Sequence, residues 1–322
     1  MIRTAECVTP MHPDKMCDRI SDAVLDVALK NDPDSRTAVE AMGGHSIVSV
    51  TGEITTDSYV NIQDIVKRIV VDKVGVQSNI VRQSGEISRG VDTGGAGDQG
   101  IMVGYACSEN EAMIPQELYL SRSLCRYIYR EYPYDGKTQI TITDDRITAI
   151  VASFQKSDQD TLRTLTKEWA ELNKLQLPNK NIYFNPAGDW ETGGFDADTG
   201  LTGRKLIVDN YGPRIPIGGG AYSGKDATKV DRSAAYMARK VAVDLLHKKG
   251  AQEVLVYLAY AIGIAQPVMA VAKIDGKEES VEGYDLTPKA IIELLGLRKP
   301  IFEDTAEWGH YGNNFAWDKV GI

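Results

Sequence analysis

Residues 13–55 read PDKMCDRISDAVLDVALKNDPDSRTAVEAMGGHSIVSVTGEIT and contain the structural pattern on which the rest of the chain is built. Pro13 suits a first helical turn, and the apolar residues after it recur at steps of three and four and predict one helical face: Met16, Ile20, Ala23, Val24, Val27 and Ala28. Residues 37–42 and 45–54 predict two strands, with Gly43 and Gly44 as the turn between them. Helical spacing returns over residues 62–70 and ends before Gly75. This part of the chain therefore predicts the order helix, strand, strand, helix.

The same order of elements returns twice further along the chain. In the middle it is predicted by residues 118–128, 138–143, 146–154 and 162–172, with Asp144 and Asp145 as the turn. Near the end it is predicted by residues 230–245, 254–260, 267–274 and 288–295, where Thr287 and Pro288 begin the last helix and Gly296 ends it. We therefore predict an α+β fold of three similar units, residues 1–92, 93–186 and 187–322, in which helices pack on small mixed or antiparallel sheets.

Composition and charge exclude several classes of protein. The 322 residues are 43% hydrophobic and 25% charged, which is typical of globular domains and not of disordered or fibrous chains. The formal net charge of −9 argues against a nucleic-acid binder that depends on general positive charge, so any bound anion must meet a local group of cations. Residues 254–272 carry no charged side chain, but Gly263, Gln266 and Pro267 interrupt this apolar stretch, which predicts buried strands and not a membrane span.

The location of the protein is predicted by its cysteines and its first residues. Cys7, Cys17, Cys107 and Cys125 lie far apart and lack the spacing of zinc ligands, which favours reduced thiols. Residues 1–15 have no apolar core of signal-peptide length. We therefore expect a cytoplasmic protein without a membrane partner.

Two glycine-rich segments, residues 92–104 and 185–224, are the predicted active loops. The second runs into GGGAYSGKD at residues 218–226, which matches the phosphate-binding pattern G-x-x-x-x-G-K but has Asp226 where that loop needs Ser or Thr for Mg²⁺. Phosphate binding by another geometry is favoured, because Lys225 and Lys229 share a helical face near Arg232. The alternative is a solvated helix start with flexible glycines.

Other residues suited to nucleotide chemistry are scattered along the chain. At a predicted helix start, His12 suits a hydrogen-bond donor to a bridging oxygen, Asp14 a Mg²⁺ ligand and Lys15 a phosphate contact. The alternative is that these residues form an ordinary helix cap. The remaining candidates include four carboxylates that either hold a cation or face water: Glu40, Glu53, Asp98 and Asp198. The others are two adjacent cations, Arg204 and Lys205, and two aromatics suited to stacking on a base, Trp190 and Tyr222. Together they predict a site for a triphosphate and a divalent metal. Which bond breaks is left open, and a kinase or nucleoside triphosphatase remains an alternative.

These segments resemble the S-adenosylmethionine synthetase (methionine adenosyltransferase) family over nearly the whole chain, from Cys7 to Lys319. The motifs are HPDKMCDRISDAVLD from His12, TGEITT from Thr51, GAGDQGIMVGYA from Gly95, GLTGRKLIVDNYG from Gly200, GGGAYSGKDATKVDRSAAY from Gly218 and YAIGIAQP from Tyr260. The resemblance implies three units about a pseudo-threefold axis and active sites between two subunits of a homodimer, or of a dimer of dimers. It also implies that the sulfur of methionine attacks C5′ of ATP and displaces the triphosphate, which is hydrolysed to phosphate and pyrophosphate. A non-catalytic relative is the other alternative, and it would have lost residues that this chain keeps.

The resemblance also implies roles for individual residues. Catalysis would involve His12, Lys137, Arg204, Lys225 and Lys229. ATP would contact His12, Lys15, Lys137, Trp190, Asp198, Arg204, Lys205, Ala221 and Lys225. Methionine would contact Glu53, Gln83, Asp98, Asp198, Lys229 and Ile262. Two Mg²⁺ ions per site would be held by Asp14 and Asp231, and K⁺ by Glu40.

Three features depart from the family pattern. The segment 83–95, which corresponds to a gating loop, is short, and so is the segment before it. Asp189 and Trp190 stand where the family usually has Arg-Phe, so an aromatic is kept while a cation becomes an anion. The chain also ends soon after Lys319, which predicts altered contacts between dimers.

Overall fold

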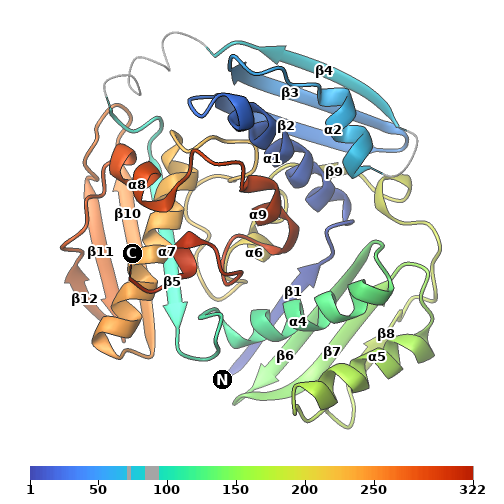
Figure 1. Cartoon of the computed structure of the whole chain (residues 1–322). Helices are drawn as coiled ribbons and strands as arrows, with labels where there is room; N and C mark the ends of the chain where they lie inside the picture. The colour runs from blue at the N-terminus through green and yellow to red at the C-terminus, as the bar shows by residue number, and fades with distance from the viewer. Residues whose placement is uncertain (71–73, 84–93, 322) are drawn as a thin grey trace.

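The computed structural model describes residues 1–70, 74–83 and 94–321 (Figure 1). Its α-helices are α1 (Pro13–Asn31), α2 (Ile62–Ile69), α4 (Gln116–Glu131), α5 (Gln159–Leu172), α6 (Leu206–Asp209), α7 (Val230–Lys249), α8 (Pro288–Leu295) and α9 (Phe302–Trp308). Its strands are β1 (Ile2–Val8), β2 (Arg36–Gly44), β3 (Ile47–Thr55), β4 (Gly75–Val81), β5 (Gly100–Cys107), β6 (Gly136–Thr143), β7 (Arg146–Phe154), β8 (Ile182–Phe184), β9 (Gly200–Leu201), β10 (Glu253–Tyr260), β11 (Met269–Ile274) and β12 (Lys277–Ser280). No helix in these ranges is long and apolar enough to cross a membrane.

The strands form three four-stranded sheets, and the α+β architecture predicted from the sequence is confirmed. Each sheet is built on one of the three predicted strand pairs: β2–β3, β6–β7 or β10–β11. Helices α1 and α2, α4 and α5, and α7 and α8 precede and follow these pairs in the chain, and Figure 1 shows each group packed with its own sheet around the centre of the molecule. The spacing of apolar residues predicts these helices and strands because each element packs against the core along one continuous apolar face.

The outermost strand on one side of each sheet comes from a distant part of the chain. The sheet orders are β9-β2-β3-β4, β1-β6-β7-β8 and β5-β10-β11-β12. Strand β1 therefore joins the middle sheet, β5 the last sheet and β9 the first sheet, in a cyclic exchange. The sequence pattern predicts none of these three strands, and β5 overlaps residues that are predicted to form an active loop. Their pairing is non-local, so neighbouring residues carry little sign of it.

The turn predicted at Gly43 and Gly44 is wrong by two residues. Both glycines end β2, and the turn is formed by His45 and Ser46, whose φ angles are 49° and 70°. Gly43 is required for packing instead: a Cβ there would lie 2.3 Å from Cζ of Phe195. The glycine pair therefore marks a close contact with a distant ring, which a local pattern cannot distinguish from a turn.

A buried ion pair joins the first unit to α7. Both terminal nitrogens of Arg232 donate to the carboxylate of Asp22, at 2.6 and 2.9 Å, and neither side chain is exposed. Nη1 of Arg232 also donates to the carbonyls of Tyr222 and Lys225, and Asp22 accepts from the backbone N–H of Gly224. The pair thus holds the loop before α7 against α1.

Replacing Asp22 with alanine is expected to lower the free energy of unfolding by about 3–5 kcal/mol, because the guanidinium of Arg232 would remain buried without a counter-charge. Urea denaturation measures this change. The matched control is Asp34→Ala, which breaks the exposed Asp34–Arg298 pair and should cost under about 1 kcal/mol. Equal small losses in both variants would contradict a structural role for the Asp22–Arg232 pair.

Candidate active site

His12 caps the N-terminus of α1 and is held as a neutral hydrogen-bond donor. Its Nδ1 accepts from the backbone N–H of Asp14 at 3.2 Å, so in the neutral ring the proton is on Nε2. Burial, followed by the positive charge of Lys205, lowers the pKa of His12 to about 4. Lys137 lowers this pKa further and Asp198 raises it, which places both charges near the ring. His12 can therefore present an uncharged N–H toward a substrate at neutral pH.

Asp14 connects the start of α1 to residues 201–205. One carboxylate oxygen accepts from the N–H of Leu201 at 2.9 Å and lies 3.2 Å from Nε of Arg204, while the other accepts from Nζ of Lys205 at 2.6 Å. Burial raises the pKa of Asp14, but the hydrogen bonds from Lys205 and Leu201 outweigh it and hold the pKa below its usual value. The carboxylate is therefore ionised, with two cations beside it.

The glycine-rich loop before α7 brings a second group of charges. Nζ of Lys225 lies 2.7 Å from Oδ2 of Asp231 in the first turn of α7, and the N–H of Gly220 donates to Oδ1 at 3.3 Å. A Cβ on Gly203 would lie 2.7 Å from Cβ of Ala221, so this loop touches the loop that carries Arg204 and Lys205. Two ionic clusters, Asp14 with Lys205 and Asp231 with Lys225, are thus carried by adjoining loops and the helix starts beside them.

Asp226 explains why the loop is not the common phosphate-binding loop. Its buried carboxylate accepts from Nζ of Lys229 at 2.5 Å and from the N–H of Thr37 at 2.9 Å. The residue that replaces Ser or Thr therefore fastens the loop to β2. In this conformation the ammonium of Lys229 is turned to the same carboxylate and is nearly buried.

The predicted methionine-binding residues lie beside these clusters. Lys225 pairs with Ala38, and Ala38 pairs with Glu53 on β3, so the three residues form one row on the same face of the sheet. The backbone N–H of Gln83 donates to the hydroxyl of Thr55. The buried side-chain oxygen, Oε1, has no hydrogen-bond partner among the described residues. A buried acceptor of this kind suits a ligand N–H.

The segment after residue 93 approaches the same region. A Cβ on Gly100 would lie 3.2 Å from Oδ1 of Asp231, and Asp98 precedes Gly100 by two residues. Ile262 is 55% exposed and is bridged to Ala96. Most of the predicted gating segment, residues 84–93, lies outside the described residues.

Other predicted residues are placed less directly. Lys137 on β6 is half-exposed and pairs with Glu6 at 2.8 Å. The indole N–H of Trp190 donates to Asn185 at 3.3 Å, and Asp189 accepts from the same asparagine. Asp198 and Glu40 are exposed, Glu40 on β2. Among the described residues, none of these side chains forms an ion pair with Asp14 or Asp231.

Two predicted contacts are not available in this conformation. The ammonium of Lys15 is buried between Asp18, at 3.1 Å, and Asp209, so it offers no surface to a phosphate. Tyr222 is also buried, and its hydroxyl bonds to Asn210 and accepts from Tyr311. The prediction that Tyr222 stacks on a base is therefore wrong: its ring packs against Tyr236 and His310 instead.

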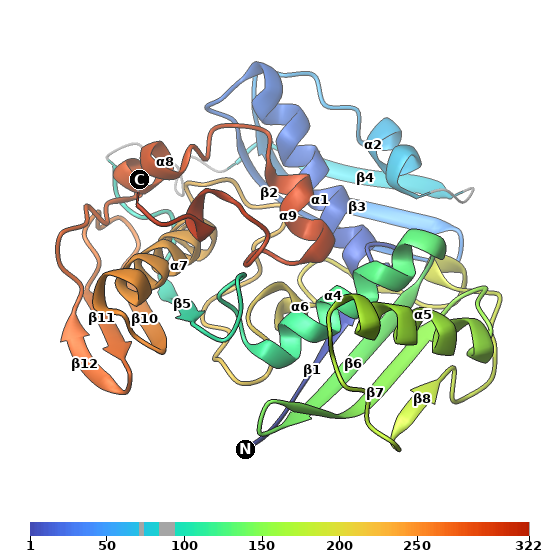
Figure 2. The same cartoon turned by 60° about the horizontal axis from the view of Figure 1, so that its bottom comes forward.

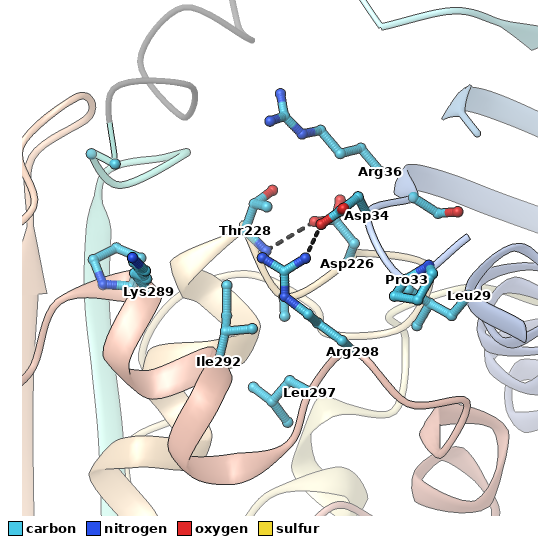
Figure 3. A pocket seen from close by; sticks show the side chains of 15 residues that line it. Leu29, Pro33, Asp34, Arg36, Asp226, Thr228, Lys289, Ile292, Leu297 and Arg298 are labelled. Atoms are coloured by element: carbon cyan, nitrogen blue, oxygen red, sulfur yellow. Dashed lines mark hydrogen bonds and ion pairs between the residues drawn. The ribbon is translucent and has the colours of Figure 1, made fainter. Parts of the chain in front are cut away.

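A separate cavity of about 340 Å³ lies next to Asp226, between the end of α1 and α8 (Figure 3). Arg36, Lys289 and Arg298 contribute cations to it, and Arg298 pairs with Asp34 across it. None of the residues predicted to bind ATP or methionine lines this cavity. The chemistry of the site therefore belongs to the loops described above.

Metal binding depends on carboxylates that stand apart. No cluster of three or more His, Cys, Asp or Glu side chains suited to a metal occurs among the described residues. Asp14 and Asp231 can each supply a single carboxylate. Mg²⁺ commonly takes one or two carboxylates, with water and substrate phosphate completing its shell, so this donor set fits a nucleotide-bound metal.

Comparison with protein-family models shows three successive matches. Residues 1–89 match the N-terminal domain of S-adenosylmethionine synthetase, residues 93–190 its central domain and residues 192–319 its C-terminal domain. The S-adenosylmethionine synthase of Sorangium cellulosum is 41% identical over 98% of this chain and 87% of its own length. The synthase of Clostridium tetani is 42% identical, and that of Pseudothermotoga lettingae 40%, each over 98% of this chain and 96% of its own length. The alignments run over 367, 377 and 379 residues against 322 here, so the relatives carry residues that this chain lacks.

Proposed function

This chain belongs to the S-adenosylmethionine synthetase family and is an S-adenosylmethionine synthase, and from that premise we propose how its own residues perform the reaction. The sulfur of methionine attacks C5′ of ATP, the bond between C5′ and the bridging oxygen breaks, and the electron pair leaves with the triphosphate. The triphosphate is then hydrolysed to phosphate and pyrophosphate. Such a displacement needs no protein nucleophile, but it needs alignment and neutralisation of the leaving group.

The leaving group is stabilised by the N–H of His12 and by the surrounding cations. Nε2–H of His12 donates to the bridging oxygen as negative charge develops on it. The polyphosphate is held by Lys137, Arg204, Lys205, Lys225 and Lys229. The observation that carries this proposal is that the two buried carboxylates, Asp14 and Asp231, already hold Lys205 and Lys225 in place. Lys15 contributes its positive charge from a buried position, because its ammonium is bonded to Asp209 and joins α1 to that residue.

Methionine and adenosine lie on either side of these charges. Glu53, Gln83, Asp198 and Lys229 orient methionine, and Ile262 contacts its side chain. The carboxylate of Asp98 offsets the positive charge that forms on sulfur. Trp190 stacks on adenine, with Ala221 and Asp198 as further contacts to ATP. The orphaned Oε1 of Gln83 supports a hydrogen bond to the substrate.

The cofactors are two Mg²⁺ ions and K⁺. Asp14 and Asp231 would hold the magnesium ions on the polyphosphate, where they neutralise charge on the leaving group. Lys205 and Lys225, which pair with these carboxylates in the structure, would then be available to the phosphates. Glu40, an exposed carboxylate on β2, is the proposed K⁺ ligand.

The pH dependence follows from the lowered pKa of His12. Because this pKa is about 4 and not 6.5, the ring stays neutral from pH 5 upward in the free enzyme. We expect kcat/KM between pH 5 and 9 to show no limb near 6.5 that depends on His12. Parallel pH profiles of the wild type and His12→Asn measure this, and a limb near 6.5 that disappears in the variant would contradict it.

The active unit is proposed to be a homodimer with shared sites, in the cytoplasm. One face of the sheet β9-β2-β3-β4 is covered by α1 and α2. The other face presents Met42, Ile47 and Val81, which are 46%, 38% and 55% exposed, beside Glu53.

The four free, buried cysteines agree with a reducing compartment. Specific activity is expected to fall on dilution as light scattering reports dissociation. Full activity of an established monomer would refute shared sites.

The activity is tested by incubating the purified protein with ATP, methionine, Mg²⁺ and K⁺ and identifying the products by chromatography and mass. S-adenosylmethionine, phosphate and pyrophosphate are expected. Chelation of Mg²⁺ should abolish the reaction, and replacement of K⁺ by Na⁺ should slow it. ADP with phosphate would instead indicate phosphoryl transfer.

A further inference from the structure

Helix α4 carries three arginines on one face, away from the site described above. Arg122, Arg126 and Arg130 are spaced four residues apart, which places them in a row with steps of about 6 Å along the helix. None of the three lies within ion-pair distance of a carboxylate in the part of the chain that the structure describes. In a chain with a net charge of −9, such a row is a local concentration of positive charge.

Arg122 is buried with its hydrogen bonds incomplete. The residue is 3% exposed, and Nη1 donates to the carbonyl of Tyr311 at 2.6 Å. Nε and Nη2 have no hydrogen-bond partner among the described residues. Burial, with Arg126 as the next contribution, lowers the pKa of Arg122 to about 10. Buried charges in proteins are normally paired. Among the described residues no carboxylate lies within ion-pair distance of this guanidinium, and Asp318 and Asp209 act on it only from further away.

The arginine row borders a cavity of about 730 Å³ between α4, α5 and residues 312–318. Figure 2 shows α4 and α5 side by side. The hydrogen bond from Arg122 to Tyr311 joins α4 to the C-terminal segment. Polar groups continue the lining: Nη2 of Arg126 donates to Asn313 at 2.6 Å, and Ser123 on α4 and Asn173 at the end of α5 also line the cavity. The cavity is therefore open to a polar ligand and too large for a single water molecule.

Two carboxylates also line this cavity, and neither neutralises the row. Asp318 is already engaged by Nε of Arg239 at 2.9 Å and by the N–H groups of Gly312 and Asn313. Glu111 is exposed and accepts from the hydroxyl of Tyr119 at 3.1 Å. The balance of charge around the cavity stays positive.

We propose that this cavity is a second anion site, which binds a phosphate-class anion with more than one phosphoryl group. Arg126 and Arg130 contact the anion as planar forks, a geometry that matches two phosphate oxygens each. Arg122 supplies positive charge from behind them. The spacing of the row suits an anion that is longer than one phosphate. No residue assigned to the synthase reaction lines this cavity, so the proposal does not depend on that assignment.

Hydrogen exchange followed by mass spectrometry, with inorganic pyrophosphate as the probe, tests this proposal in the full-length protein. Pyrophosphate should slow exchange in residues 119–131 and 311–318. In Arg130→Gln, the pyrophosphate concentration for half-maximal protection of these segments should rise about tenfold or more. Protection of residues 218–232 by binding at the active site should be unchanged, which separates the two sites in one measurement.

The controls use the same measurement. Arg130 is exposed, so its replacement leaves the fold intact; Arg126→Gln is the second variant. Arg163→Gln on α5 removes an exposed arginine that does not line the cavity and should behave as the wild type. The proposal is overturned if sodium chloride at equal ionic strength gives the same protection. It is also overturned if residues 119–131 and 311–318 are not protected, or if Arg126→Gln and Arg130→Gln need the same pyrophosphate concentration as the wild type for half-maximal protection.

Discussion

Lys225→Ala is expected to lower kcat/KM for ATP by about 10²–10³-fold, the usual effect of removing one donor that stabilises a developing charge. In the wild type the ammonium lies 2.7 Å from Asp231 and is partly exposed, so it can turn to a polyphosphate. Without it, the nearly buried carboxylate of Asp231 would repel the triphosphate as well. Steady-state kinetics with varied ATP, at saturating methionine and Mg²⁺, measure the loss.

The matched control for this variant is Lys249→Ala. Lys249 ends the same helix, α7, and forms an exposed pair with Glu279 at 2.9 Å, far along the helix from Asp231. Its removal should leave kcat/KM unchanged within about twofold, because exposed pairs contribute little. Lys225→Arg should recover part of the activity by restoring the charge. A kcat/KM near the wild-type value in a folded Lys225→Ala protein would defeat the proposed role.

His12→Ala is expected to lower kcat by about 10²–10³-fold while the KM for ATP changes by less than about threefold. The N–H on Nε2 meets the bridging oxygen most strongly as the C5′–O bond breaks, so its loss affects the transition state more than ATP binding. Single-turnover formation of S-adenosylmethionine isolates this step from hydrolysis of the triphosphate.

Controls for His12→Ala separate chemistry from helix capping. His247→Ala removes an exposed histidine from the last turn of α7 and should leave kcat unchanged. His12→Asn keeps a side chain that can cap α1 and donate a hydrogen bond, so it should lose less activity than His12→Ala. If the alanine variant raised KM strongly and left kcat intact, His12 would serve binding and not the leaving group.

Much of the candidate site could be predicted because its residues stand in short, contiguous motifs. His12 and Asp14 share the first turn of α1, and Arg204 and Lys205 are adjacent. The residue types of the loop at 218–226 predict phosphate binding, and Asp226 marks its departure from the common phosphate-binding loop. The sequence could not reveal that Asp226 binds Thr37 and Lys229, since Thr37 is nearly 190 positions away. It also could not reveal that Lys15 and Tyr222 are buried, because burial depends on what packs over a side chain.

Local sequence is enough to specify the three helix–strand–strand–helix groups and the chemical types of the side chains in the active loops. Each of those features is set by residues close together in the chain, where apolar period and turn chemistry act directly. Tertiary packing, in contrast, is what places β1, β5 and β9 in the sheets of other units and pairs Asp14 with Lys205 and Asp231 with Lys225. These arrangements depend on pairing between distant segments, whose energy comes from the packed whole and leaves little trace in local sequence.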